Sequence, residues 1–202
     1  MINPLFSVHR KRRNVPAGKM AEVLELAVER SENKCSCCQI AIPKRVGLAF
    51  KDSNPNNTNE DNVFAVCKIC EALHSGGKLD VDRIYGTMVY LPQLSQVELI
   101  RLAHALYNLE RMGRHTALLV NVKENIKSLS KIPKKMYGTN DVDAFSEVLL
   151  NMKEASYNKR NIGLSGIRFW PDIESFKSDL HHYSASFLDE ADLDNYISVN
   201  FS

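Results

Sequence analysis

Apolar positions in the first third of the chain change their period, which predicts a helix followed by short strands. The range 17–33 carries apolar residues at the three-and-four spacing of one helical face: Met20, Val23, Leu24 and Ala27. The range 45–51 is short, apolar and β-branched or aromatic at intervals, which predicts a strand. The polar range 52–62 predicts a solvated loop outside the core, and an apolar run begins again at Val63.

Glycine and proline mark the ends of the next elements. A brief helix over 68–74 is predicted to stop at Gly76 and Gly77. The range 83–91 predicts a strand, in which Gly86 marks a turn or the close approach of another backbone. We place the end of the β-containing part at Pro92.

A long helix opens the second part of the chain. Ser95 and Glu98 have the spacing of a capping box, in which both side chains bind free amides of the first turn. The helix is predicted to run to about Arg111, and its buried stripe comprises Val97, Ile100, Ala103, Leu106 and Leu109. The opposite face is predicted to be solvated and comprises Arg101, His104, Asn108 and Arg111.

Three further helices are predicted over 116–130, 142–154 and 171–186, with the segments around Pro133 and Gly138 as breakers. The last of them carries an apolar stripe that we expect to pack into the core: Ile173, Phe176, Leu180, Tyr183 and Phe187.

Composition is that of an ordinary globular protein, with 44% apolar and 25% charged residues among 202. No stretch approaches the roughly 18 consecutive apolar residues that span a bilayer, and the N-terminus lacks the apolar run of a signal peptide. We therefore expect a cytoplasmic protein.

The net charge of +2 is too small to indicate a nucleic-acid partner by itself, so we interpret the basic run 9–13 and the acidic tail 189–194 as solvated termini.

Four of the five cysteines fall into two close pairs, which suits metal binding in a reducing compartment. Cys35 with Cys38, and Cys67 with Cys70, supply the four thiolates of a tetrahedral structural zinc site. We interpret Cys37 as a spare thiol, because a pair separated by one residue closes poorly on a tetrahedral ion. The competing interpretations are two redox dithiols or four unrelated buried thiols. A shell of four thiolates leaves no position for water, so this metal is not expected to do chemistry.

The order of elements around these cysteines resembles zinc-carrying HNH nuclease domains, which are of the treble-clef type. The resemblance rests on a cysteine knuckle, a strand, a polar loop, an apolar run and a second cysteine pair at a helix start. It rests also on Asn62, five residues before Cys67, where that family has its structural asparagine. It implies an α+β fold with a zinc-binding α/β half, residues 1–92, and a mainly helical half, residues 93–202, packed as one compact unit.

The chain departs from HNH nucleases at the catalytic base. Those enzymes carry a histidine near the end of the strand before the loop, whereas the range 47–52 here reads Gly-Leu-Ala-Phe-Lys-Asp. His74 alone does not make a hydrolytic site, and we interpret it as a solvated surface residue. We therefore expect no catalytic residues and no enzymatic activity.

A second resemblance lies at the start of the long helix. The run Val-Tyr-Leu-Pro-Gln-Leu-Ser-Gln-Val-Glu-Leu over 89–99, followed by Leu102, His104, Ala105 and Leu106, resembles the IcmJ (DotN) family. The range 161–164 resembles it more loosely. These proteins are components of the type IVB (Dot/Icm) secretion machinery of bacteria.

The resemblance implies a non-catalytic, zinc-stabilised adaptor of the coupling complex. Such an adaptor binds the C-terminal tail of the coupling ATPase at the cytoplasmic face of the inner membrane, contacts other coupling-complex subunits and helps recruit effector proteins for export. Partner contacts have no aligned motif, but Tyr137, Phe169 and Trp170 are candidates because they lie outside the periodic stripes. Packing of Trp170 before a helix start is the alternative.

Two other functions stay open at this point. One is an HNH-type DNA nuclease with a displaced histidine. The other is a zinc-stabilised DNA-binding protein of a conjugative transfer system that uses its basic arm, residues 10–13.

Overall fold

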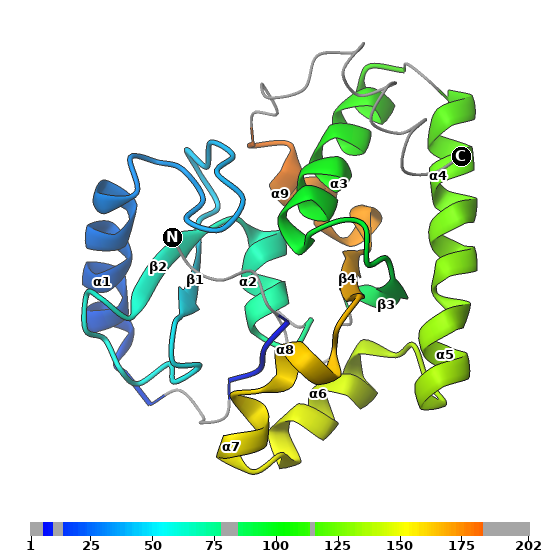
Figure 1. Cartoon of the computed structure of the whole chain (residues 1–202). Coiled ribbons are helices and arrows are strands. Elements are labelled where there is room, and N and C mark those ends of the chain that lie inside the picture. The colour runs from blue at the N-terminus through cyan, green and yellow to red at the C-terminus, as the bar shows by residue number, and fades with distance from the viewer. Residues whose placement is uncertain (1–5, 10–13, 78–84, 114–115, 184–202) are drawn as a thin grey trace.

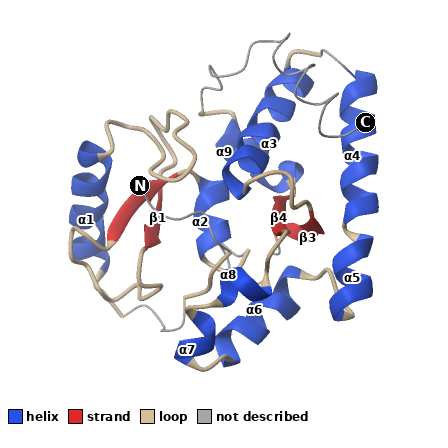
Figure 2. Ribbon diagram, viewed as in Figure 1, coloured by secondary structure: helices blue, strands red, loops and turns tan. Residues whose placement is uncertain are grey.

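The computed structural model describes residues 6–9, 14–77, 85–113 and 116–183 (Figures 1 and 2). Its architecture is mixed α/β, with two small antiparallel sheets set among helices. One sheet and its helices come from the N-terminal part of the chain, and the other lies among the later helices (Figure 2).

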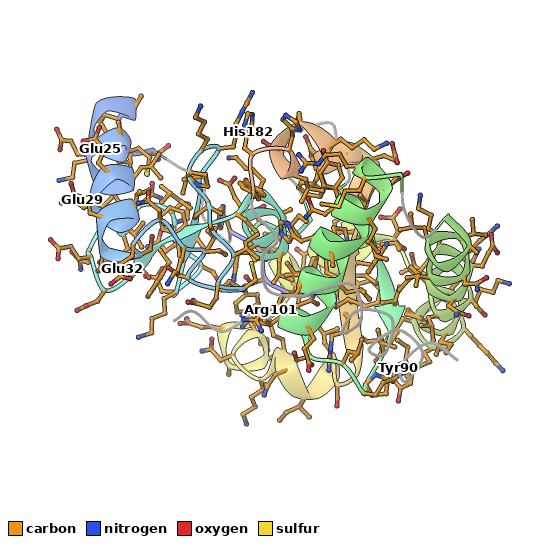
Figure 3. All side chains as sticks on the ribbon, turned by 90° about the horizontal axis from the view of Figure 1, so that it is seen from above. Glu25, Glu29, Glu32, Tyr90, Arg101 and His182 are labelled. Carbon is orange, nitrogen blue, oxygen red and sulfur yellow. The ribbon has the colours of Figure 1, made fainter. Side chains whose placement is uncertain are left out.

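The N-terminal part is a hairpin flanked by two helices. Strand β1 (Gly47–Phe50) pairs with β2 (Val63–Val66) in the register Gly47↔Val66. Helix α2 (Lys68–His74) packs against β1, and helix α1 (Ala17–Arg30) packs against β2. Met20 and Ala27 are the buried side chains of α1, as predicted. Figure 3 shows Glu25, Glu29 and Glu32 pointing away from the protein along the outer side of this region.

The polar loop between the strands is more deeply seated than its composition predicts. Ser53 and Asn62 are buried, at 5% and 6% exposure. Asn62 accepts a hydrogen bond from the Asp52 amide and donates one to the Asn57 carbonyl, at 3.0 and 2.7 Å. The expectation that the whole loop is solvated is therefore wrong at these positions. Local hydrogen bonds satisfy the Asn62 side chain, whereas the Ser53 hydroxyl bonds to the distant Tyr157 hydroxyl at 3.1 Å.

The second sheet joins segments far apart in sequence, so the prediction that the β-containing part ends at Pro92 is wrong. Strand β3 (Gly86–Tyr90) pairs with β4 (Ile167–Pro171), and Gly86 lies opposite Pro171. A Cβ at Gly86 would lie 2.2 Å from the Trp170 carbonyl oxygen, so the predicted close approach at this glycine is confirmed.

The edge of β4 is completed by a side chain. Gln96 donates from Nε2 to the Phe169 carbonyl at 2.7 Å and accepts from the Phe169 amide at 2.8 Å. The primary amide thus replaces one residue of a neighbouring strand, which satisfies both polar groups of a fully buried residue.

Helix α3 (Gln96–Arg111) begins at the predicted capping box, with both the Ser95 and Glu98 bonds present.

The helices that follow are α4 (Thr116–Leu129), α5 (Lys131–Tyr137), α6 (Val142–Asn151), α7 (Glu154–Tyr157) and α8 (Arg160–Gly163). Pro133 was expected to break the chain, but it lies in the first turn of α5, where its missing amide has no helical partner to lose. Gly138, with φ of 79°, ends that helix as predicted.

The predicted helix over 171–186 is wrong in its form. Its first residue belongs to β4, and it continues as a 3₁₀ turn, η1 (Ile173–Phe176), and a short helix, α9 (Lys177–Leu180). The apolar stripe is nevertheless buried, since Ile173, Phe176, Leu180 and Tyr183 have at most 6% exposure. Phe187 lies outside the described residues.

Buried apolar residues form one cluster that includes side chains from both parts of the chain. Within the described residues, no helix has the length and apolar character needed to cross a membrane.

Candidate metal centre

The four paired cysteines meet in one place. The sulfur atoms of Cys35, Cys38, Cys67 and Cys70 all lie within 4.8 Å of one another. The Cys38 and Cys67 sulfurs are 3.8 Å apart, close to the roughly 3.8 Å edge of a tetrahedron with zinc–sulfur bonds of about 2.3 Å. All four side chains have 0% exposure.

The first pair lies on a tight knuckle after α1. The Cys35 amide donates to the Ile40 carbonyl at 2.8 Å, and the Gln39 amide donates back to the Cys35 carbonyl at 2.9 Å. Gln39 adopts a φ of 66°, which reverses the chain direction. The Cys38 amide then points at the Cys35 sulfur, 3.4 Å away.

The second pair opens helix α2. Cys67 is its N-cap residue and accepts from the Cys70 amide at 3.5 Å. The Cys67 amide in turn donates to the Cys35 sulfur at 3.3 Å. Amide donors and the positive end of a helix both favour thiolates over thiols.

Hydrogen bonds among the four sulfurs and their burial set the pKa values of the cluster. Burial raises the pKa of the Cys35 thiol, but bonds from Cys38, Cys67 and Cys70 outweigh it, so the pKa lies well below its usual value. Burial holds the pKa of Cys67 and Cys70 well above it, and hydrogen bonding to Cys35 adds to this. Burial likewise raises the pKa of Cys38. The directions differ because Cys35 accepts the hydrogen bonds of the other three sulfurs, and a bound dication would favour the thiolate form of all four.

Three side chains from the second part of the chain close over the cysteines. Arg101 on α3 donates from Nε to the Cys38 carbonyl at 2.9 Å, and Figure 3 shows Arg101 on that helix. His104, one turn later, has Nε2 3.7 Å from the Cys67 sulfur. The Tyr183 hydroxyl accepts from the Lys68 amide at 3.1 Å and donates to the Arg45 carbonyl at 2.7 Å.

The prediction of a solvated face on α3 is wrong at His104, which is 1% exposed. Helix α3 lies between the cysteine cluster and the second sheet, so both of its faces are covered. Burial lowers the pKa of His104 to about 4, which keeps the ring neutral and able to donate a single N–H toward sulfur.

The donor set fits zinc. Four soft thiolates in a closed, fully buried shell are the ligands of a structural zinc ion, and they leave no coordination position for water or substrate. The arrangement can hold a metal and stabilise the fold around it.

Comparison with known proteins bears on the rest of the chain. No family model matches it. It is 24% identical over 171 residues to the type 4 apparatus protein DotN of Legionella pneumophila, which covers 80% of this chain and 78% of that protein. The resemblance to the DotN (IcmJ) family is confirmed. A match of this length to DotN extends beyond residues 1–92, so the likeness is not a property of the cysteine pairs alone.

Cys37 adjoins the cluster, because its thiol hydrogen-bonds to Cys70 and helps to raise the pKa of that thiol. It is buried, at 2% exposure, but it is not one of the clustered sulfurs. Its interpretation as a spare thiol remains a prediction.

His74 is not the solvated residue that the sequence suggested. It is 4% exposed, and its Nδ1 lies 3.2 Å from the Ser7 hydroxyl, because the segment 6–9 lies over the end of α2. Burial lowers its pKa to about 4. Among the described residues, no carboxylate hydrogen-bonds to His74, and Phe50, itself 2% exposed, ends the strand where HNH nucleases carry their base.

The three aromatic candidates for partner contacts separate into two kinds. Phe169 and Trp170 are core residues of β4, at 0% and 8% exposure, so they are not surface anchors. Tyr137 is 44% exposed at the end of α5 and remains a candidate. The sequence signal for β4 was the β-branched and aromatic run Ile-Arg-Phe-Trp before Pro171.

Proposed function

We propose that this chain is a component of a Dot/Icm-type IV secretion system and acts there as a zinc-stabilised adaptor without catalytic activity. The observation that carries this proposal is the similarity to DotN, itself named a type 4 apparatus protein, over most of both chains. The sealed cysteine cluster supports a structural zinc ion, because none of its ligand positions is open.

An HNH-like, treble-clef origin of the N-terminal part is included in the proposal. The knuckle, the β1–β2 hairpin and the helix that opens at Cys67 support it. So does Asn62, which ties the loop to Asp52 and Asn57 as a structural asparagine does. Residues 1–92 and 93–202 would then fold as one unit, which the shared apolar cluster and the Arg101 bond to Cys38 support.

The partner in this proposal is the C-terminal tail of the coupling ATPase, at the cytoplasmic face of the inner membrane. Other coupling-complex subunits and exported effectors would assemble around it. A protein with a closed metal shell and no catalytic base on β1 would act through the surfaces that it presents to other proteins. Apolar burial against a tail that orders on binding is little screened by salt.

Co-expression with the coupling ATPase from the same genome tests the proposal. A stoichiometric complex should survive gel filtration at about 200 mM salt, whereas binding to duplex DNA through basic residues would weaken steeply between about 50 and 200 mM. The matched control is the ATPase without its C-terminal tail. Tight, salt-sensitive binding to DNA with no affinity for the tail would refute the adaptor function.

A further inference from the structure

The surface formed by α5 to α8 contains a preformed apolar cavity. Its volume is about 390 Å³, and its apolar lining includes Tyr137, Ala144, Phe145, Val148, Met152 and Leu164. In Figure 1, α6 and α7 lie at the lower edge, with α8 above them and α5 at the lower right.

Apolar side chains around this cavity are exposed. Val148 is 57% exposed and Tyr137 44%, and Ile162, on α8, is 71% exposed. The Tyr137 ring packs edge-on against Phe145, with centroids 5.6 Å apart, and its hydroxyl donates to the Gly163 carbonyl at 3.1 Å. These two contacts hold the Tyr137 ring in place at the side of the cavity. Clustered exposed apolar residues are typical of an interaction surface.

A second cavity, more polar than the first, adjoins it. Its volume is about 220 Å³, and it shares Arg160 and Leu164 with the apolar cavity. Arg168 lines it from β4. No Asp or Glu is among the residues that line either cavity.

Backbone carbonyls hold both arginines in place. Arg160 donates from Nε to the Phe6 carbonyl at 3.1 Å, and Arg168 donates from Nε to the Leu94 carbonyl at 2.7 Å. Within the described residues, neither guanidinium forms an ion pair with a carboxylate.

Each guanidinium also donates from Nη1 to a second carbonyl, Arg160 to Tyr157 at 3.1 Å and Arg168 to Ile167 at 2.9 Å. Of the five N–H donors of each guanidinium, three therefore remain for an anionic group. The Glu98 carboxylate acts on Arg168 from a distance and is not among the lining residues.

We propose that the two cavities form one docking site for an extended peptide segment of a partner protein. A large apolar side chain of the segment occupies the first cavity, and a nearby carboxylate binds at Arg160 and Arg168. A peptide fits better than a small amphiphile, because two cavities that share Arg160 and Leu164 offer adjacent positions for two side chains of one segment. That the partner is another secretion component rests on the proposed function, whereas the chemistry of the site rests on the described residues.

Selection of binders from a displayed library of random peptides, with the zinc-loaded protein as the target, tests the site without any assumed partner. Peptides with a large apolar residue close to an Asp or Glu should be enriched. Val148→Asp should weaken the selected peptide by roughly tenfold or more, because it places a carboxylate at the mouth of the apolar cavity. Val120→Asp is the matched control, since Val120 lies on α4 with 56% exposure, and it should leave binding unchanged.

The carboxylate contact is tested on the peptide, so the fold of the protein is untouched. Replacing the acid of the selected peptide by its amide should weaken binding by about tenfold, as expected for a charge-assisted hydrogen bond. Arg160→Gln should abolish this difference between acid and amide.

Three results would overturn the docking site. They are no enrichment, enrichment of peptides without the acid, and binding that Val120→Asp weakens as much as Val148→Asp. Tight binding of a simple amphiphile such as laurate in competition with the peptide would replace the peptide site by a small-molecule site. Because no ATPase is used, failure of the ATPase co-expression experiment leaves this result standing, and the reverse is also true.

Discussion

The Nε–H of Arg101 donates to the carbonyl of Cys38 at 2.9 Å, so the first helix of the second part holds the first cysteine knuckle. His104, on the same face of α3, reaches the Cys67 sulfur of the other pair. Helix α3 thereby connects the metal centre to the second sheet, because Gln96 at its start binds the backbone of β4. Stability of the metal centre and packing of the later helices are therefore coupled.

This coupling predicts the effect of removing Arg101. Arg101→Ala should lower the free energy of unfolding by roughly 1–3 kcal/mol, because the Cys38 carbonyl loses a charged donor in a buried setting. Zinc should also transfer to a chromogenic chelator faster from this variant than from the wild type. The control is Arg111→Ala, at the exposed end of the same helix, which should change both quantities little. Equal zinc-release rates for the two variants would show that α3 does not support the knuckle.

Elements with local signals could be predicted from the sequence. The capping box at Ser95, the helix between Cys67 and Gly76, and the cysteine set itself depend on residues a few positions apart. The run Ile-Arg-Phe-Trp indicates a strand, but no local pattern reveals its partner. The paired residues of β3 lie 77 to 85 positions earlier in the chain.

The periodic stripe used for α3 does not indicate the burial of His104, and no local pattern indicates that of His74. A helical stripe indicates which face is most apolar, but it does not indicate whether a second surface covers the other face. On α3, Leu99, Leu102 and Ala105 are buried outside the predicted stripe, and an apolar character on both sides is the signal that could have placed His104. His74 is covered by the segment 6–9, whose position no local pattern reveals.

The cysteine cluster predicts one zinc ion per chain. Ser at any one of the four ligand positions should abolish soluble folding, because a structural zinc site contributes folding free energy directly. Elemental analysis of protein purified without chelator measures the stoichiometry. Cys37→Ser is the matched control and should keep one zinc, with a stability loss of about 1 kcal/mol at most for this buried thiol. An intact fold with almost no metal would remove the site.

The absence of a histidine at the end of β1 predicts that the protein does not cleave DNA. Supercoiled plasmid incubated with the protein and Mg²⁺, Mn²⁺ or Ni²⁺ should remain uncut on a gel, since Phe50 stands where a base must deprotonate water. His74 cannot replace that base, because its ring is buried against Ser7. Cleavage that disappears in His74→Ala would instead establish the nuclease.

Burial of neutral His74 predicts how stability depends on pH. Its pKa falls from about 6.5 in the unfolded chain to about 4 in the folded protein, because burial disfavours the charged ring. Between these values the unfolded chain binds more protons, so the contribution of His74 to stability is complete above pH 6.5 and is lost as the pH falls toward 4. Between pH 7.5 and 5.0, the wild type should lose roughly 2 kcal/mol more than His74→Asn.

Asparagine is chosen for this comparison because its amide can keep a hydrogen bond to Ser7 in place of Nδ1, whereas it carries no titrating group. Zinc release at low pH affects both proteins, so the difference between their urea-unfolding free energies isolates the histidine. The same slope with pH in both proteins would mean that His74 is protonated, or reached by water, in the folded state.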